Sequence, residues 1–363
     1  MSKDEVMKTQ IQILPILLFI GLVLILISCS EQNSTPTRPN EPTPIQWDPP
    51  PFNEDGWAVI TTFPDSLVNP GGNVNLRIIE AADARVAWVS DWQTKLIFKT
   101  EDGGSTWKVL EPPVTGSLYT IESFDSLTLW IGTQQGEILN SIDGGYSWVE
   151  QHKGSFINYI EFFDRQNGIA MGDPPQGSSK IEILHTSNGG VTWTNKNSII
   201  GYGTTHYAVN FCDQNNGWIR TRPSNEFVFH TNDGGITWDT LYPGGSQNIW
   251  TLVCVSPKIA MLSYNLTPMR TSDTGQSWQE LSLSIVGYPS RYAKVKDASS
   301  WVWGEGGGGE VFGSTDSGET WKIVSTGIND AWWDINSPSK DVVWLSGRSK
   351  ITYTVKADSL LSY

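Results

Sequence analysis

The sequence predicts an all-β protein, a seven-bladed β-propeller of four-stranded antiparallel blades, and three observations carry this prediction. The 363 residues include 35 glycines, 20 prolines and 18 tryptophans, and 11% of the residues are aromatic. So much ring surface favours a packed core over disorder, and so much glycine argues against a helical bundle. One octapeptide occurs six times at intervals of 40–45 residues, which is the length of one four-stranded propeller blade.

The octapeptide is expected to form the hairpin between the third and fourth strands of each blade. Its third residue can accept hydrogen bonds from the N–H groups of a turn, and the six copies hold Asp102, Asp143, Asn188, Asp233, Asp273 and Asp316. Its last residue, where the fourth strand should begin, is always a tryptophan: Trp107, Trp148, Trp193, Trp238, Trp278 and Trp321. Each ring removes about 150–250 Å² from water, so these tryptophans should hold neighbouring blades together.

The chain contains seven such units, but the last one stops after its third strand and lacks the octapeptide. The missing strand is expected from the other end of the chain. Residues 57–60 (WAVI) match the outer strand WKIV of the sixth unit, and the preceding Glu54-Asp55-Gly56 looks like a worn octapeptide. We therefore expect residues 57–62 to pair with residues 351–355 and close the ring, which leaves no unpaired edge between the first and last blades.

The first residues resemble a bacterial lipoprotein signal. Lys3 and Lys8 precede an apolar run that ends in Leu26-Ile27-Ser28-Cys29, and in such signals the cysteine is acylated before cleavage. A retained membrane helix is the alternative, because the run is close to the length of a membrane span. The cysteine at the end of the run and the lack of a basic cluster after it favour the lipoprotein.

The predicted organisation follows from this signal. We expect a signal peptide over residues 1–28, a lipid on Cys29, a proline-rich linker over residues 29–56 and the propeller over residues 57–363. A multiply acylated cysteine anchors a protein stably. The expected location is the bacterial cell envelope, in the outer membrane if the cell has one, with the membrane contacted through the Cys29 lipid.

Charge and residue counts exclude several classes of function. The net charge of −14 argues against a nucleic-acid partner, and with four histidines and three cysteines we expect no metal site and no cofactor. His185 and His230 share a repeat position before the octapeptide, which indicates a structural role. Cys212 and Cys254 sit at equivalent positions of adjacent units, and because a disulfide needs Cα atoms within about 7 Å, we expect two buried free thiols. The protein is expected to be a monomer.

Strand order predicts which face of the propeller carries function. Because strands within a blade are antiparallel, the octapeptides share one face, and the starts of the inner strands share the other with the second-to-third loops. Loops on a rigid scaffold usually hold binding groups, and aromatic residues and arginines are enriched at binding hot spots. The candidate site residues on that face are Arg77, Trp92, Asp173, Arg220, Arg222, Trp250, Arg291, Trp333 and Arg348. The alternative is that the aromatic residues only fill the channel.

The octapeptide resembles the Asp-box, or bacterial neuraminidase repeat. Units such as NGWIRTRPSNEFVFHTNDGGITW are similar to the photosystem II stability/assembly-factor-like family of Asp-box propellers, over nearly all of residues 57–363. The resemblance implies a propeller that binds protein partners during assembly of an envelope or membrane complex, without catalysis. Nothing in the chain points to a photosystem. We expect a protein partner or a glycan on the face opposite the Asp-boxes.

The competing interpretation is a sialidase-like glycoside hydrolase or a non-catalytic carbohydrate-binding propeller, because sialidases also carry Asp-boxes. The five arginines of the candidate site could supply the arginine triad of such an enzyme. However, Arg77-Ile78-Ile79 stands where sialidases have Arg-Ile-Pro, and sialidases have six blades. The glycine-rich segment that contains Glu305 lacks the lysine of a phosphate-binding loop and is expected to be a flexible, solvated loop.

Overall fold

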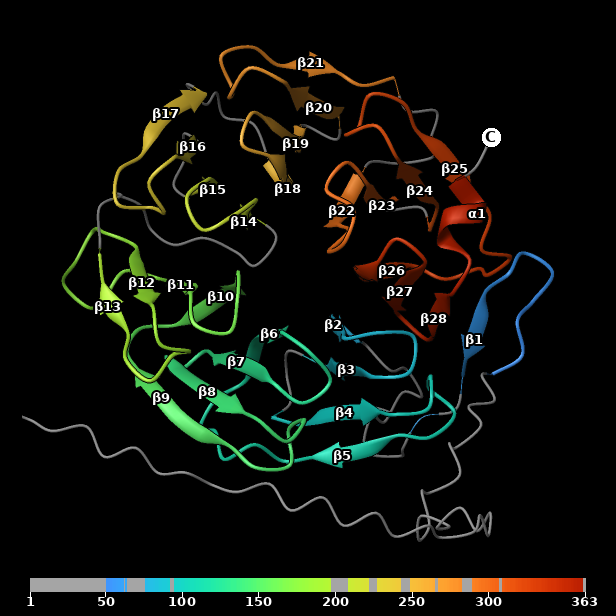
Figure 1. The fold of residues 1–363 in the computed structure, drawn as a ribbon, viewed down its shortest axis with the longest axis horizontal. Coiled ribbons are helices and arrows are strands. Elements are labelled where there is room, and N and C mark those ends of the chain that lie inside the picture. Colours follow the sequence, from blue (N-terminus) through green and yellow to red (C-terminus); the bar gives the residue numbers. More distant parts are fainter. Residues whose placement is uncertain are drawn as a thin grey trace, which may run out of the picture. The chain divides into compact units, whose positions relative to one another are not determined.

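The computed structural model describes residues 50–61, 63, 76–91, 95–196, 208–221, 227–242, 249–264, 267–282, 289–306 and 309–361. These residues form seven four-stranded antiparallel sheets, arranged as blades around a central channel (Figure 1). The predicted seven-bladed all-β propeller is therefore confirmed. Within these ranges, none of the helices has both the length and the hydropathy needed to cross a bilayer.

In each of the first six blades the strands follow chain order from the channel outward. Blade 1 consists of β2 (Ile78–Ala81), β3 (Ala87–Ser90), β4 (Ile97–Thr100) and β5 (Lys108–Leu110). Blade 2 consists of β6 (Leu118–Ser123), β7 (Leu129–Thr133), β8 (Glu137–Ser141) and β9 (Val149–Lys153). Blade 3 consists of β10 (Ile157–Phe162), β11 (Gly168–Gly172), β12 (Glu182–Thr186) and β13 (Thr194–Asn195). Blade 4 consists of β14 (Val209–Phe211), β15 (Gly217–Arg220), β16 (Val228–Thr231) and β17 (Asp239–Tyr242). Blade 5 consists of β18 (Ile249–Ser256), β19 (Ile259–Tyr264), β20 (Thr267–Thr271) and β21 (Gln279–Glu280). Blade 6 consists of β22 (Pro289–Lys294), β23 (Val302–Gly306), β24 (Val311–Ser314) and β25 (Lys322–Val324).

Blade 7 is closed by the N-terminal strand, as predicted. It consists of β26 (Trp332–Ser339), β27 (Val342–Gly347), β28 (Ile351–Thr354) and, outermost, β1 (Ala58–Ile60). β1 runs antiparallel to β28, with Ala58 opposite Tyr353 and Ile60 opposite Ile351. The ring therefore has no open seam between its first and last blades.

Trp57 fastens this closing strand to blade 6. Its side chain is fully buried, and its Nε1 donates a hydrogen bond to the Ser325 carbonyl at 3.1 Å. Just before it, Asn53 Oδ1 accepts the Trp57 backbone N–H at 2.9 Å, and Asn53 Nδ2 donates to the Thr326 carbonyl at 2.8 Å. A short helix that the sequence did not predict, α1 (Ala357–Leu361), packs into the same hydrophobic cluster as Trp57.

The Asp-box hairpins are built as the sequence predicts, although each outer strand begins one residue after the tryptophan rather than at it. In the second copy, Asp143 Oδ1 accepts the Ser147 N–H at 2.8 Å, and Oδ2 accepts the Ser147 hydroxyl at 2.6 Å. These bonds from Ser147 lower the pKa of Asp143 to about 2. Gly145 has φ 99° and faces Leu110 of the preceding blade, so both its conformation and its lack of a side chain are required.

Replacing Asp143 by alanine is expected to lower the free energy of unfolding by about 1–3 kcal/mol, because turn N–H groups lose their acceptor. Asparagine is the matched control. In the third copy Asn188 Oδ1 accepts the Thr192 N–H at 2.9 Å, and its Nδ2 donates to the Thr192 hydroxyl at 3.0 Å. Asp143→Asn should therefore lose much less stability than Asp143→Ala in urea unfolding. Equal losses in the two variants would contradict this role.

Two sets of tryptophans join neighbouring blades. The Asp-box tryptophans are half-buried at blade junctions; Trp148, for example, packs against a cluster that blades 1 and 2 share. The second-strand tryptophans lie deeper, and those that are fully buried are Trp88, Trp130, Trp218, Trp303 and Trp344. Trp88 Nε1 donates to the Gly144 carbonyl in the Asp-box of the next blade at 3.1 Å. The second-strand tryptophans, which were not predicted to join blades, therefore also contribute to the contact between blades.

The prediction of two free thiols is wrong. Cys212 and Cys254 form a disulfide between blades 4 and 5, with their Cα atoms 5.2 Å apart. Inner strands of adjacent blades converge at the channel, and there equivalent positions come within bridging distance. The same junction carries a hydrogen bond from the Cys254 N–H to Asn210 Oδ1 at 2.8 Å.

His185 gives the fold a dependence on pH. It lies in β12 against Gly234 of the next Asp-box, and its Nε2 is buried with no hydrogen-bond partner among the described residues. Burial lowers its pKa to about 4; Lys196 adds to this effect and Asp233 opposes it. The neutral ring is therefore favoured in the folded state, and its contribution to stability is complete only above the unfolded pKa of about 6.5.

The expected result is a loss of stability on the order of 1–3 kcal/mol as the pH falls from about 6.5 to about 4. His185→Asn, which copies Asn140 at the same repeat position, should flatten this part of the profile. Urea unfolding at several pH values measures it. An unchanged slope in the variant would mean that His185 carries no such linkage.

Candidate functional site

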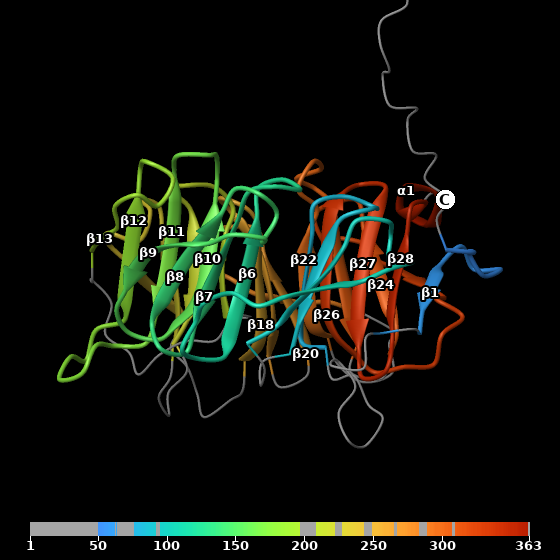
Figure 2. The ribbon, with the colours of Figure 1, turned by 90° about the horizontal axis from the view of Figure 1, so that it is seen from below.

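The strands of each blade run between two faces of the propeller, which is seen edge-on in Figure 2. Because the strands are antiparallel, the Asp-box hairpins share a face with the loops between the first and second strands. Each Asp-box contacts the loop between the first and second strands of its own blade: the Gly103 N–H donates to Arg85 O at 2.9 Å, and the Gly144 N–H donates to Leu127 O at 2.7 Å. We call this side the box face. The opposite side, formed by the inner-strand starts and the second-to-third loops, is called the rim.

Two of the candidate residues are in contact on the rim. Arg77 lies over the ring of Trp333 with Cζ 4.4 Å from the ring centroid, which joins blades 1 and 7 by a cation–π contact. Trp250 of blade 5 is 45% exposed and Arg348 of blade 7 is exposed, so both offer surface to a partner. Asp173, in the loop that follows β11 of blade 3, is half-buried.

Three further rim candidates are either buried or outside the residues that the structure describes. Arg220 is only 6% exposed, so it contributes little surface to the rim. Trp92 and Arg222 lie outside the described residues, as does Cys29.

Arg291, near the start of the inner strand β22, is half-buried beside a buried carboxyl group. It sits directly opposite Glu305 in the pairing of β22 with β23, and the hydroxyl of Ser290 donates to Glu305. Glu305 is fully buried, so its assignment to a solvated loop is wrong. Burial raises the pKa of Glu305 to about 8, although Arg291 and Ser290 oppose this shift. Burial likewise raises the pKa of Asp334 to about 7, against the effect of the Ile79 N–H.

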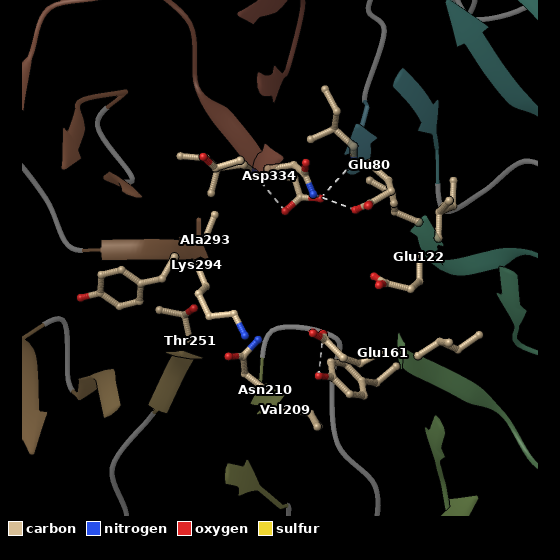
Figure 3. A pocket seen from close by; sticks show the side chains of 18 of the residues that line it. Glu80, Glu122, Glu161, Val209, Asn210, Thr251, Ala293, Lys294 and Asp334 are labelled. Atoms are coloured by element: carbon tan, nitrogen blue, oxygen red, sulfur yellow. Dashed lines mark hydrogen bonds between the residues drawn. The ribbon is translucent and has the colours of Figure 1, made fainter. Parts of the chain in front are cut away.

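The channel holds a polar cavity of about 140 Å³ lined by all seven inner strands. Carboxylates of blades 1, 2 and 3 (Glu80, Glu122 and Glu161) line it together with Asp334 of blade 7 and the lysines of blade 6 (Figure 3). Tyr159 and Tyr292 also line the cavity, together with aliphatic residues such as Ile121 and Leu252. Charged and amide side chains therefore share the channel lining with apolar ones.

The channel carboxylates have a structural task. Each inner strand is the edge strand of its blade, so half of its N–H groups point away from the ladder and need an acceptor. Glu80 accepts the Ser123 N–H at 3.3 Å and Asp334 accepts the Ile79 N–H at 3.0 Å, in each case from the next blade around the ring. Asn210 makes the same bond to blade 5 through Cys254. Side chains of one blade therefore close the exposed edge of its neighbour.

Two lysines cross the channel from blade 6. Lys296 Nζ lies 2.9 Å from Glu80 Oε1 and donates to the Ser123 carbonyl at 3.0 Å. Lys294 Nζ donates to the carbonyls of Phe211 and Cys212, both at 3.2 Å. These lysines follow the box-face end of β22, so they bridge blades 1, 2, 4 and 6 at that end of the channel.

The charges in the channel act on one another. Burial disfavours the ammonium of Lys296, but attraction by Glu80 and Glu122 outweighs it and raises the pKa of Lys296 above its usual range. Burial raises the pKa of Glu122 well above its usual range; Lys296 opposes this shift, and Glu161 and Glu80 add to it. No group of three or more His, Cys, Asp or Glu side chains in the described ranges is arranged to hold a metal ion.

The channel residues were not predicted from the sequence, because only the first residues of each inner strand were considered as candidate site residues. A signal was present: the segments IIEA, TIES and YIEF place a glutamate at the same position of three successive inner strands. An edge strand with a repeated charge facing a closed channel predicts such blade-to-blade bonding.

Comparison with known proteins agrees with this architecture. Residues 149–297 match the family model described as photosynthesis system II assembly factor YCF48. The chain is an Asp-box propeller resembling that family. None of the curated proteins matches the sequence.

Solved structures show the same fold at low sequence identity. YCF48 bound to D1 peptide is 18% identical with a TM-score of 0.63, and the match covers 85% of this chain and 99% of that chain. YCF48 from Cyanidioschyzon merolae is 15% identical with a TM-score of 0.60, covering 82% and 98%. A catalytically inactive virginiamycin B lyase from Staphylococcus aureus with quinupristin is 12% identical with a TM-score of 0.61, covering 82% and 99%. At these identities the likeness concerns the fold alone.

Proposed function

We propose that this chain is a lipid-anchored scaffold of the bacterial envelope, whose propeller binds a protein partner through its rim without catalysis. The observation that carries the proposal is the rim itself. Trp250 is exposed near the start of the inner strand β18, and Arg77 lies over the ring of Trp333 near the starts of β2 and β26, while lysines bridge the other end of the channel. Aromatic residues and arginines are the types most enriched at binding hot spots.

The similarity to an assembly-factor family supports this choice over other uses of the fold. One structural neighbour is YCF48 in complex with a D1 peptide, which gives a precedent for peptide binding by such a propeller. We infer an analogous role here, in which a segment of an envelope protein is held during assembly. The partner itself is defined only by the rim it must fit.

A crosslinking pull-down from intact envelopes tests rim binding. The variant Trp250→Ala/Arg348→Ala removes exposed side chains of the rim, and Val109→Ala, on an outer strand with 40% exposure, is the matched control. We expect the double variant to lose at least 5-fold of the captured partner and the control to lose none. Equal capture by the wild type and the double variant would refute the rim as the binding face.

Lipid anchoring by Cys29 is a separate part of the proposal and has its own test. Metabolic labelling with a palmitate analogue should mark the wild-type protein, and Cys29→Ser should abolish both the label and sedimentation with membranes. A Cys29→Ser variant that still sediments after a carbonate wash would instead support a retained membrane helix over residues 11–27.

One observation favours the alternative of a glycoside hydrolase or carbohydrate-binding propeller. Glu305 and Asp334 are buried carboxyls with pKa values of about 8 and about 7 next to an arginine, and a general acid needs such a raised pKa. A fluorogenic sialoside assay and a glycan array, with Arg220→Ala and Arg348→Ala as controls, test it. Turnover that these substitutions abolish would replace the scaffold proposal with an enzyme.

A further inference from the structure

A set of exposed apolar side chains lies on the box face, away from the rim. Five apolar side chains there are 46–73% exposed, and they follow one another over blades 2, 3 and 4. We call them the box-face arc: Leu127, Ile142, Tyr146, Val191 and Ile236. Exposed apolar groups that gather on one side of a soluble domain mark interaction sites.

The repeat supplies an internal control for this arc. Tyr146, Val191 and Ile236 occupy the sixth position of their Asp-boxes, where the remaining copies hold Ser105, Gln276 and Glu319. Ile142 occupies the second position, where the other copies hold Glu101, Ser187, Asn232, Ser272 and Thr315. All six hairpins form with the same hydrogen bonds at the Asp or Asn, so the fold does not require apolar residues at these positions.

The surroundings of the arc are acidic. Asp143 and Asp233 belong to its Asp-boxes, and Asp125 and Asp164 lie in the adjoining loops of blades 2 and 3. Hydrogen bonds from Ser147 and Asn167 lower the pKa values of Asp143 and Asp164, so both are ionised at neutral pH. Three cations lie among these groups: Arg165 pairs with Asp125, and Lys99 and Lys108, which both pair with Glu101, contact the ring of Tyr146. With Glu101 included, five carboxylates stand against these three cations, so the net charge around the arc is negative.

We propose that the box-face arc binds a basic amphipathic segment of a second protein. Apolar side chains of the segment would cover Ile142, Val191 and their neighbours, and its lysines or arginines would meet the flanking carboxylates. An amphipathic helix of about 18 residues is about 27 Å long and presents one apolar stripe with cations beside it. An anionic lipid surface is disfavoured as the occupant, because these carboxylates would face its negative charge.

The test uses a fluorescently labelled 18-residue leucine–lysine peptide and the full-length protein. Ile142→Ser/Val191→Ser introduces residue types found at equivalent positions of other Asp-boxes, and Ile323→Ser, 47% exposed on blade 6, is the matched control. By fluorescence anisotropy we expect at least 5-fold weaker binding for the double variant and no change for the control. Binding by the wild type should weaken as salt rises, because the flanking charges are screened.

Other outcomes would overturn the proposal. These are equal affinity of the double variant, equal affinity for a leucine–glutamate peptide, or wild-type binding to phosphatidylglycerol vesicles that the double variant loses. Trp250→Ala should leave peptide binding unchanged, since Trp250 lies on the opposite face. A negative result for the box-face arc would therefore not contradict the proposal of rim binding. Circular dichroism and an unchanged thermal transition establish that the serine variant is folded.

Discussion

Replacing Trp57 by alanine is expected to lower the free energy of unfolding by about 3–5 kcal/mol, as is usual when a buried tryptophan is truncated. Trp57 is fully buried against blade 6 and donates to Ser325, while the strand that follows it completes blade 7. The substitution removes the residue that fastens the two ends of the chain together. Chemical denaturation measures the loss.

Val59→Ala is the control for this substitution, because Val59 lies in the same strand and is only half-buried. It should lose about 1 kcal/mol or less. Deletion of residues 57–62 should be more damaging than either substitution, since it exposes the edge of β28. A deletion variant with an unchanged thermal transition would show that the N-terminal strand does not close the ring.

Replacing Lys296 by methionine is expected to cost about 2–3 kcal/mol of stability. Glu80 is 5% exposed and would lose its cationic partner, and a buried charge without a partner is strongly destabilising. This expected loss is smaller than the usual 3–5 kcal/mol for breaking a buried ion pair, because the Lys296 side chain is partly exposed to the channel. Urea unfolding measures this loss as well.

A double-mutant cycle with Glu80→Gln separates the charge pair from simple packing. Glutamine can still accept the Ser123 N–H, so Glu80→Gln/Lys296→Met should be more stable than the sum of the single losses implies. Strict additivity would contradict the cross-channel ion pair. Lys340→Met, an exposed lysine at the end of β26, is the control and should change stability by no more than about 0.5 kcal/mol.

The parts of the fold that the sequence predicted are those that repeat or that replace a missing repeat. Six Asp-boxes at one spacing defined the hairpins, the blade number and the two faces, and a seventh unit without an outer strand required Trp57 and the residues after it to supply one. Local turn chemistry carries this information, so it can be read without knowing distant contacts. The closure of blade 7 was therefore predictable to within two residues.

The remaining features depend on how neighbouring blades converge, and the sequence of a single repeat unit does not contain that information. The Cys212–Cys254 disulfide needed the close approach of two inner strands at the channel. The buried state of Glu305 needed the position of its neighbour Ser290. Among the rim candidates, the sequence could not show that Trp250 is exposed and Arg220 is buried. A one-residue change of register reverses which side of a strand faces outward.

Site-specific photo-crosslinking in intact envelope preparations tests the central claim most directly. A benzophenone amino acid placed at position 250 reports on the rim, and the same group at position 109 reports on an outer strand with similar exposure. We expect a discrete crosslinked protein band from position 250 and none from position 109. Identical adduct patterns from both positions, or adducts from position 109 alone, would contradict a rim-directed scaffold.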